Sequence, residues 1–230
     1  MQKNTRGEVI LINTKRPPKD TLIPGAIFTF IFSVWIILVT IQSNFIQTFD
    51  KTIINLVCNR NPANISFAKT FTVLGNTKTI VFETIVLVVL LLIFRQNIYA
   101  LFTAATIAAA NGFNWILKHV VQRPRPTVHH LVYADGYSFP SGHSVGSASL
   151  FGVLIILTLL LIRSGALKAI LVIIWALFPL TIGYTRIFLH VHYPSDVVGG
   201  WFEGITFVLI AYSILYHYYI EPRMYEINNS

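Results

Sequence analysis

Charged residues are scarce in this sequence. Asp, Glu, Lys and Arg make up 11% of its 230 residues, whereas about 25% is usual in a soluble domain. Hydrophobic residues make up 54% of the chain, and the mean hydropathy is +0.65. This composition excludes an ordinary soluble globular protein and predicts an integral membrane protein.

Cysteine and acidic residues are also rare. Cys58 is the only cysteine, which excludes an intrachain disulfide and a metal site built from cysteines. Nine acidic residues stand against 17 basic ones, giving a net charge of +8. The basic residues are spread over the ends of apolar segments and form no continuous stripe, which argues against nucleic-acid binding. A membrane protein with an anionic substrate fits this balance better.

Long apolar segments dominate the rest of the chain. A transmembrane helix needs about 20 mostly apolar residues, and several segments approach or reach that length. We therefore predict an all-α fold, a polytopic bundle of six transmembrane helices. The predicted spans are Thr21–Phe49, Thr79–Phe94, Ile98–Leu117, Ser144–Ile162, Ala169–Gly183 and Val197–Tyr219.

The polar segments complete this layout. Residues 50–78 mix charged and apolar side chains, so we expect an amphipathic segment that lies in the membrane interface. Residues 1–20 and 220–230 are predicted to be cytoplasmic tails on either side of a membrane domain of residues 21–219.

Orientation follows from the placement of Lys and Arg. With the N-terminus inside, the cytoplasmic side carries nine of these cations and the outer side eight. The positive-inside rule supports this orientation only after the cations of a functional site are set aside. Six spans put both termini on the cytoplasmic side, and they put the polar stretches 118–143 and 184–196 together on the extracytoplasmic side.

The stretch 184–196 lies between two apolar segments, yet it contains Arg186, His192 and Asp196. Charge at the edge of a span is costly and is often functional. Pro194 favours a helix start, so Asp196 would lie in the first turn and reach back toward His192. A His oriented by an Asp can act as base or nucleophile. The alternative is a set of interfacial charges that cap a span.

Two more groups of polar residues lie in the loop between the third and fourth spans. Lys118 and Arg125 are at its start, and Ser141, Gly142 and His143 are at its end. Taken singly, the first group resembles a solvated membrane flank and the second a helix cap. Together with Arg186, they supply three cations, a hydroxyl and a helix N-terminus, which suit a bound phosphate.

The three stretches together resemble the signatures of the type 2 phosphatidic acid phosphatase (lipid phosphate phosphatase) superfamily. The pattern is Lys-x6-Arg-Pro, then Pro-Ser-Gly-His, then Ser-Arg-x5-His-x3-Asp. The matching residues are Lys118, Arg125 and Pro126, then Pro140 to His143, then Arg186, His192 and Asp196. The flanking residues 135–139 and 192–197 resemble the bacterial branch that hydrolyses undecaprenyl diphosphate and phosphatidylglycerophosphate.

The resemblance implies an enzyme, a metal-independent lipid phosphatase that works through a phosphohistidine. His192 is then the nucleophile, Asp196 orients it, and His143 is the acid and base. The implied phosphate-binding residues are Lys118, Arg125, Ser141, Gly142 and Arg186. No cofactor is expected. Metal binding at His192 and Asp196 is the rival interpretation, and it lacks further carboxylate or cysteine ligands.

Two positions depart from the family pattern. Thr185 stands where the family has Ser, and it keeps a hydroxyl, so we expect phosphate contact to be retained. His190 stands where bacterial members often have Gly, and an added imidazole there is expected to crowd the site or to change its pH dependence.

The expected substrate is a membrane lipid phosphate or diphosphate. Undecaprenyl diphosphate is the best candidate, because Arg123 and His119 would remain to bind a second phosphate. The alternatives are a phosphatidylglycerophosphate or phosphatidate phosphatase, a lipid phosphotransferase that uses the same residues, and a transporter or scaffold with a degenerate site. The expected partners are the lipid substrate and the bilayer, and the sequence predicts no oligomeric state.

Overall fold

The computed structural model describes residues 21–58 and 62–223, and these residues form helices joined by short connections, with one longer loop. The predicted tails lie outside the described residues, apart from residues 220–223. The α-helices are α1 (Leu22–Thr40), α2 (Asn44–Val57), α3 (Pro62–Phe71), α4 (Thr77–Ile93), α5 (Asn97–Val121), α6 (Gly142–Leu161), α7 (Gly165–Phe188) and α8 (Pro194–Leu215). A 3₁₀ turn, η1 (Thr72–Gly75), joins α3 to α4, and a π-helical turn, η2 (Tyr216–Ile220), follows α8.

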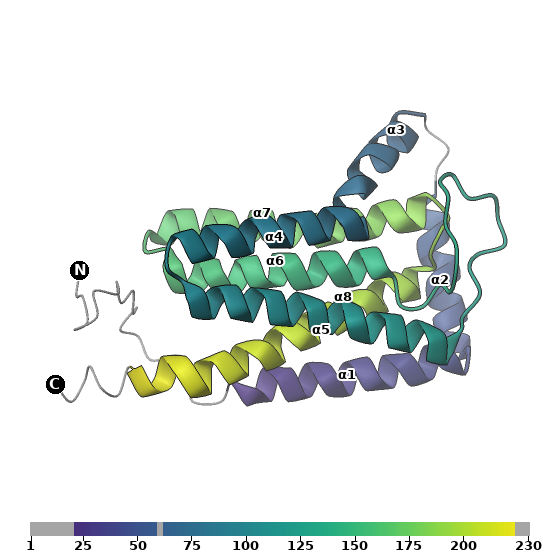
Figure 1. Cartoon of the computed structure of the whole chain (residues 1–230). Helices are drawn as coiled ribbons and strands as arrows, with labels where there is room; N and C mark the ends of the chain where they lie inside the picture. The colour runs from purple at the N-terminus through teal and green to yellow at the C-terminus, as the bar shows by residue number, and fades with distance from the viewer. Residues whose placement is uncertain (1–20, 59–61, 224–230) are drawn as a thin grey trace.

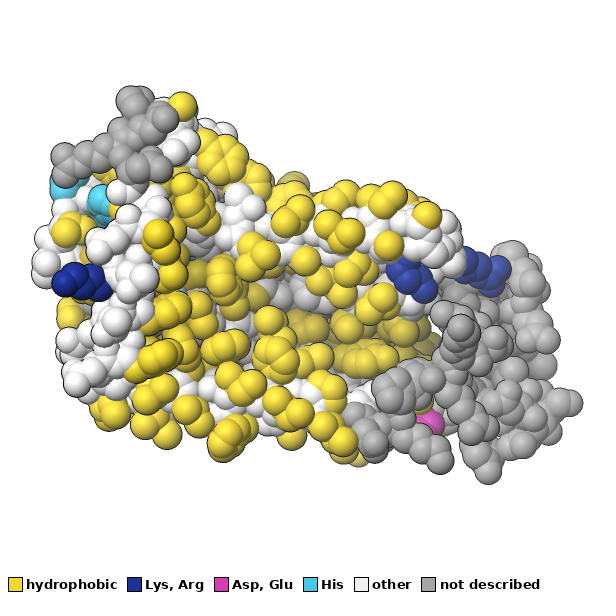
Figure 2. Space-filling model, turned by 180° about the vertical axis from the view of Figure 1, so that it is seen from behind, with side chains coloured by type: hydrophobic (Ala, Val, Ile, Leu, Met, Phe, Trp, Pro, Cys, Tyr) yellow, Lys and Arg dark blue, Asp and Glu magenta, His cyan; other side chains and the backbone are white. Residues whose placement is uncertain are grey.

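The long helices run side by side, and α6 is at their centre (Figure 1). It contacts α4, α5, α7 and α8, while α1 packs against α8 on the outside. The outer helices expose large apolar side chains such as Phe30, Phe82 and Ile173. In the rear view, hydrophobic side chains cover the middle of the bundle and the visible cations lie at its two ends (Figure 2). This is the surface expected of a protein in a bilayer.

The all-α, multi-pass prediction is therefore confirmed. Within the described residues, five helices are long and apolar enough to cross a membrane. A sixth crossing needs α3, η1 and α4 to count as one broken span, whose two parts meet at a bend of 50°.

The first predicted span was too long. Its helix stops at Thr40, and Gln42 takes a left-handed backbone conformation with φ 49°. The hydroxyl of Ser43 then accepts a hydrogen bond from the backbone N–H of Ile46 and caps a new helix, α2. A capping serine competes with helix continuation, so the uncharged run to Phe49 contains a break.

The other boundaries shift less. Helix α7 continues to Phe188, which places Arg186 in its last turn and not in a loop. Helix α8 begins at Pro194, as predicted. Helix α5 ends at Val121, because Gln122 adopts a left-handed conformation with φ 51° and Pro124 follows.

Small residues bring α8 against the N-terminal half of α6. A Cβ atom on Gly200 would lie 2.7 Å from the carbonyl oxygen of Ser141, and one on Gly204 would lie 2.7 Å from Cβ of Ala148. The two backbones are therefore as close as they can be. As a result, the first turn of α8 lies next to the first turn of α6.

The polar stretches share one end of the bundle, as predicted. The loop between α5 and α6 and the connection between α7 and α8 both lie at the end where α2 and α3 are found (Figure 1). At the other end, the hydroxyl of Thr21, just before α1, lies 3.2 Å from that of Ser213 in α8. The described chain therefore starts and finishes at the end away from these stretches.

Candidate active site

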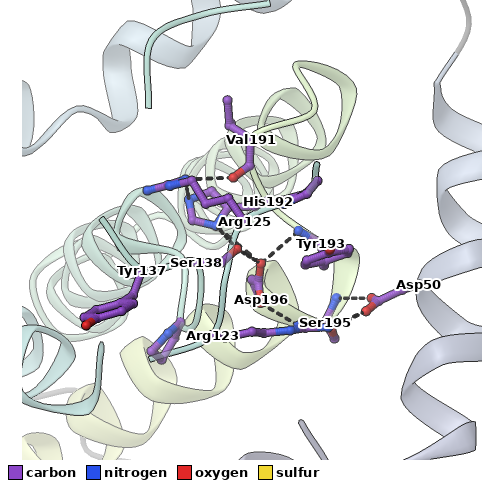
Figure 3. Close-up of polar contacts among 12 residues, drawn as sticks. Asp50, Arg123, Arg125, Tyr137, Ser138, Val191, His192, Tyr193, Ser195 and Asp196 are labelled. Carbon is purple, nitrogen blue, oxygen red and sulfur yellow. Dashed lines mark hydrogen bonds and ion pairs between the residues drawn. The ribbon is translucent and has the colours of Figure 1, made fainter. Parts of the chain in front are cut away.

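His192 is held between an acid and a cation (Figure 3). Its Nδ1 lies 3.5 Å from Oδ2 of Asp196, and its Nε2 lies 3.2 Å from Nη1 of Arg125. An arginine can only donate, so Nε2 of His192 must present its lone pair. The proton of the neutral ring is therefore on Nδ1, which faces the carboxylate. The predicted approach of Asp196 to His192 is confirmed.

Asp196 is fully buried in the first turn of α8, and donors surround its carboxylate. Oδ2 accepts the backbone N–H of Tyr193 at 2.8 Å and the hydroxyl of Ser138, and Oδ1 accepts Nη1 of Arg123 at 2.6 Å. The contact with Tyr193 is the reach back past the helix start that the sequence predicted. These donors keep the buried acid ionised.

The imidazole of His192 is almost completely buried, with 3% of the residue exposed. Burial lowers its pKa to about 3, and the opposing effect of Asp196 only partly offsets this. Arg186 and Lys118 lower the pKa further. His192 is therefore neutral near pH 7, which is the form that a nucleophile requires.

Three cations around this histidine have no carboxylate partner within the described residues. Nζ of Lys118 donates to the carbonyl of Tyr137 at 2.7 Å. Nη1 of Arg186 donates to the hydroxyl of Thr72 at 2.8 Å, and its Nε has no partner. Arg125 donates to the backbone carbonyls of Asp135, Gly136 and Val191. Three uncompensated positive charges favour a bound anion.

The first turn of α6 faces the same region. The backbone N–H of Ser141 donates to the carbonyl of Asp196 at 3.0 Å, which joins the second and third motifs. Ser141 occupies the N-cap position, yet its side chain caps nothing, and its buried hydroxyl has no hydrogen-bond partner. Gly142 opens the helix, whose first N–H groups lack intrahelical acceptors. A free hydroxyl and a helix N-terminus are further features that favour a bound anion.

His143 also lies in this first turn, and its Nε2 is 2.7 Å from Oδ1 of Asn76. Asn76 comes from the bend before α4. No sequence pattern indicated this contact, because an Asn before a helix is already explained as an N-cap.

Of the two residues reserved for a second phosphate, Arg123 is not available for it. Arg123 is bound to Asp196 and, through Nη2 at 2.9 Å, to Asp50. Burial opposes its charge, but Asp196 and Asp50 more than offset this and raise the pKa of Arg123. His119 is exposed, its ring is tilted by 44° against that of Trp115, and its Nδ1 lies 2.7 Å from the carbonyl oxygen of Trp115. The prediction of Arg123 as a spare cation was therefore wrong, while a role for His119 in binding a second phosphate stays a prediction.

Asp50 was missed as a site residue. Its carboxylate accepts the backbone N–H and the hydroxyl of Ser195, each at 2.7 Å, in addition to Arg123. It is 5% exposed, although the sequence analysis assigned it to an interfacial segment. The helical spacing could have predicted the burial of Asp50, because Ile46, Asp50 and Ile54 are four residues apart and share one face of α2.

The two departures from the motif pattern have local explanations. The hydroxyl of Thr185 donates to the carbonyl of Ile182 at 2.6 Å, within its own helix. His190 adopts a left-handed conformation with φ 61°, which glycine takes without strain. Its half-buried ring has Nδ1 3.4 Å from the carbonyl oxygen of His129, and within the described residues its side chain has no hydrogen bond to a residue of the proposed site. The expected crowding by His190 is not observed.

A comparison with protein-family models identifies the family of this chain. The model of the PAP2 superfamily matches residues 99–219. The chain is a member of the PAP2 superfamily. The match includes all three motifs, from Lys118 to Asp196, but it excludes Asp50, Thr72 and Asn76. These three residues come from segments that the PAP2 model does not cover.

Curated PAP2 relatives are moderately similar to this chain. Phosphatidylglycerophosphatase B of Bacillus subtilis is 32% identical over 99 residues, which are 43% of this chain and 49% of that protein. Undecaprenyl-diphosphatase BcrC of Bacillus subtilis is 31% identical over 137 residues, which are 56% of this chain and 66% of that protein. The chain therefore spans about half to two thirds of the length of these relatives.

A solved structure shares the PAP2 fold. A transmembrane PAP2-type phosphatidylglycerolphosphate phosphatase from Bacillus subtilis superposes with a TM-score of 0.74, covering 83% of this chain and 94% of that chain. The sequence identity is 23%, so this likeness concerns the fold alone.

Asp50 should be needed for both stability and activity. An Asp50→Ala change leaves Arg123 buried with one partner fewer, which typically costs about 3 to 5 kcal/mol of unfolding free energy. We expect a lower thermal midpoint in detergent and a loss of activity at the candidate site, because Arg123 also holds Asp196. Lys51→Ala, at the exposed neighbouring position, is the control and should change neither. An Asp50→Ala protein as stable and active as the wild type would contradict the structural role of Asp50.

Proposed function

We propose that this protein is an integral membrane phosphatase that hydrolyses a lipid phosphate or diphosphate through a phosphohistidine on His192. The observation that carries the proposal is the neutral imidazole of His192, whose Nε2 lone pair points toward cations that have no carboxylate partner. This arrangement combines a nucleophile with an anion site at one end of a membrane bundle.

In the first step, Nε2 of His192 attacks phosphorus and forms a P–N bond. The bond from phosphorus to the leaving oxygen breaks, and His143 donates the proton that this oxygen needs. The phosphorylated ring carries a positive charge, and its Nδ1–H faces the carboxylate of Asp196. The carboxylate stabilises that charge and keeps the ring oriented.

In the second step, His143 takes a proton from water, and the water oxygen attacks phosphorus. The P–N bond breaks, inorganic phosphate leaves, and His192 returns to its neutral form. His143 is again protonated and ready for the next substrate. The same residue thus serves as acid and then as base.

The cations stabilise the transferring phosphoryl group. Lys118, Arg125 and Arg186 would bind its equatorial oxygens, with the free hydroxyl of Ser141 and the N–H groups at Gly142. Stabilising this spread charge is the main task in phosphoryl transfer. Within the described residues, no group of three or more His, Cys, Asp and Glu side chains has the arrangement of a metal site, and we propose a mechanism without a metal.

A lipid is the substrate class that fits the position of this site. The cations lie at the end of an apolar bundle, so a bound phosphate would sit at headgroup level while its tail remains in hydrocarbon. Undecaprenyl diphosphate remains our first candidate, and its support now comes from the similarity to BcrC. Arg123 no longer supports a second phosphate, so phosphatidylglycerophosphate and phosphatidate are the competing substrates.

We further propose that the site faces away from the cytoplasm and that both termini are cytoplasmic. Arg123 is paired with carboxylates, and Lys118, Arg125 and Arg186 belong to the proposed site. Without these four, the outer side carries four Lys and Arg against nine on the inner side. The positive-inside rule then supports this orientation.

Catalysis is tested by phosphate release from a lipid phosphate in the presence of EDTA. The wild-type protein should remain active in the chelator, because the proposed mechanism uses side-chain cations. His192→Ala should lose more than about 1,000-fold in kcat, and His143→Ala should accumulate a phosphoenzyme. Substantial turnover by His192→Ala would refute the assignment of the nucleophile. Rescue of an EDTA-inhibited protein by a divalent ion would refute the metal-free mechanism.

Substrate class is tested by comparing kcat/KM for undecaprenyl diphosphate, a phosphatidate and a soluble phosphate ester in one detergent. We expect both lipids to exceed the soluble ester, since a lipid anchors its phosphate at the depth of the cations. Equal turnover of the soluble ester would rule out an embedded substrate. A phosphatidate that exceeds the diphosphate would replace the isoprenoid candidate, and transfer to an added lipid alcohol would identify a phosphotransferase.

Orientation is tested by labelling single cysteines in intact cells, in a Cys58→Ser background. Val128→Cys, in the exposed loop between α5 and α6, should react with a membrane-impermeant thiol reagent. Ser164→Cys, in the turn between α6 and α7, should react only after permeabilisation. The opposite pattern would invert the proposed topology.

A further inference from the structure

The bend between α3 and α4 contacts two residues of the proposed site. At its start, the hydroxyl of Thr72 accepts a hydrogen bond from Arg186. At its end, Oδ1 of Asn76 lies 2.7 Å from Nε2 of His143. Between them, a Cβ atom on Gly75 would lie only 3.1 Å from Cδ2 of His143. The bend is therefore packed directly against the imidazole ring.

Asn76 occupies the N-cap position of α4, but it does not act as a cap. An N-cap Asn normally accepts a hydrogen bond from an N–H of its own helix. Here the Asn76 side chain makes no capping hydrogen bond, and its oxygen contacts His143 instead. Helix α4 therefore lacks a capping hydrogen bond that would stabilise it by about 1 kcal/mol. The Asn76 side chain bonds to His143 instead.

The contact decides which nitrogen of His143 can exchange a proton. An amide oxygen only accepts, so Nε2 of His143 carries a proton and donates it to Asn76. The other nitrogen, Nδ1, is then the atom whose proton is given and taken back. Within the described residues, Asn76 is the only hydrogen-bond partner of the His143 side chain.

We propose that Asn76 is a positioning residue for His143: it fixes the tautomer and ring orientation, so that Nδ1 is available to the leaving oxygen and then to water. This inference rests on the proposed function of His143 as acid and base. It also gives a role to the bend in a segment that the sequence analysis assigned to the membrane interface.

The test compares Asn76→Ala with Asn76→Asp in lipid phosphate hydrolysis. Asn76→Ala removes the acceptor, so kcat should fall about 10- to 100-fold. This loss is a part of the rate enhancement that general acid–base catalysis provides. KM should stay within about threefold, because the phosphate-binding cations are untouched. Thr77→Ala, at the exposed next position, is the matched control and should retain wild-type kcat.

Asn76→Asp keeps an acceptor in the same place and adds a negative charge. It should retain most of the wild-type kcat. A carboxylate beside His143 holds the proton of the ring more tightly, so the acid form persists to higher pH. The alkaline fall of kcat/KM should therefore move up by about one pH unit or more. A residue with a merely structural role would not lower kcat at an unchanged KM when its acceptor is removed and recover it when the acceptor is restored.

A double mutant separates this inference from the proposed function. If Asn76 acts through His143, then Asn76→Ala combined with His143→Ala should be no slower than His143→Ala alone. Additive losses would overturn the positioning role, and so would wild-type activity of Asn76→Ala. An Asn76→Asp variant as impaired as Asn76→Ala would also overturn it, since it would mean that the asparagine donates to the ring. Full activity of His143→Ala would instead refute the proposed acid and base.

Discussion

The ionised carboxylate of Asp196 is the constraint on which the rest of the site depends. Removing a carboxylate from water costs several kcal/mol unless donors replace its hydration. These donors come from the backbone at Tyr193, from Ser138 and Arg123 in the loop after α5, and from His192 itself. The loop, the start of α8 and the imidazole must therefore be in place together, and each stabilises the position of the others.

Arg123 and Arg125 have different hydrogen-bond partners, and this decides which of the two can attract a phosphate. The two arginines are separated by a single proline, yet one is neutralised by carboxylates while the other is bound by neutral carbonyl groups. A cation that already has two carboxylate partners adds little attraction for a phosphate. The arginine without a carboxylate partner, beside His192, has a full charge available for an incoming anion.

The motifs allowed much of the architecture to be predicted, because their spacing is local and their chemistry is specific. Helical apolar runs, the start of α8 at Pro194 and the approach of Asp196 to His192 all depend on neighbouring residues. The failures concern contacts distant in sequence. Asp50 meets Arg123 across 73 positions, and Asn76 meets His143 across 67. The break at Gln42 was missed for another reason, since nothing in an uncharged stretch marks it except the capping Ser43.

The close contact of Gly200 and Gly204 with α6 has a mechanical consequence. These contacts set the separation of the two helices by backbone atoms and the Cβ atoms of small residues, which leaves no layer of large, deformable side chains at these positions. His143 lies in the first turn of one of these helices, and Asp196 lies in the first turn of the other. A bilayer that thickens or thins acts mainly on the lipid-facing helices around this pair, such as α1 and α7. Helices α6 and α8 would then move as one rigid body. The distance between His143 and His192 would therefore not change when the thickness of the membrane changes.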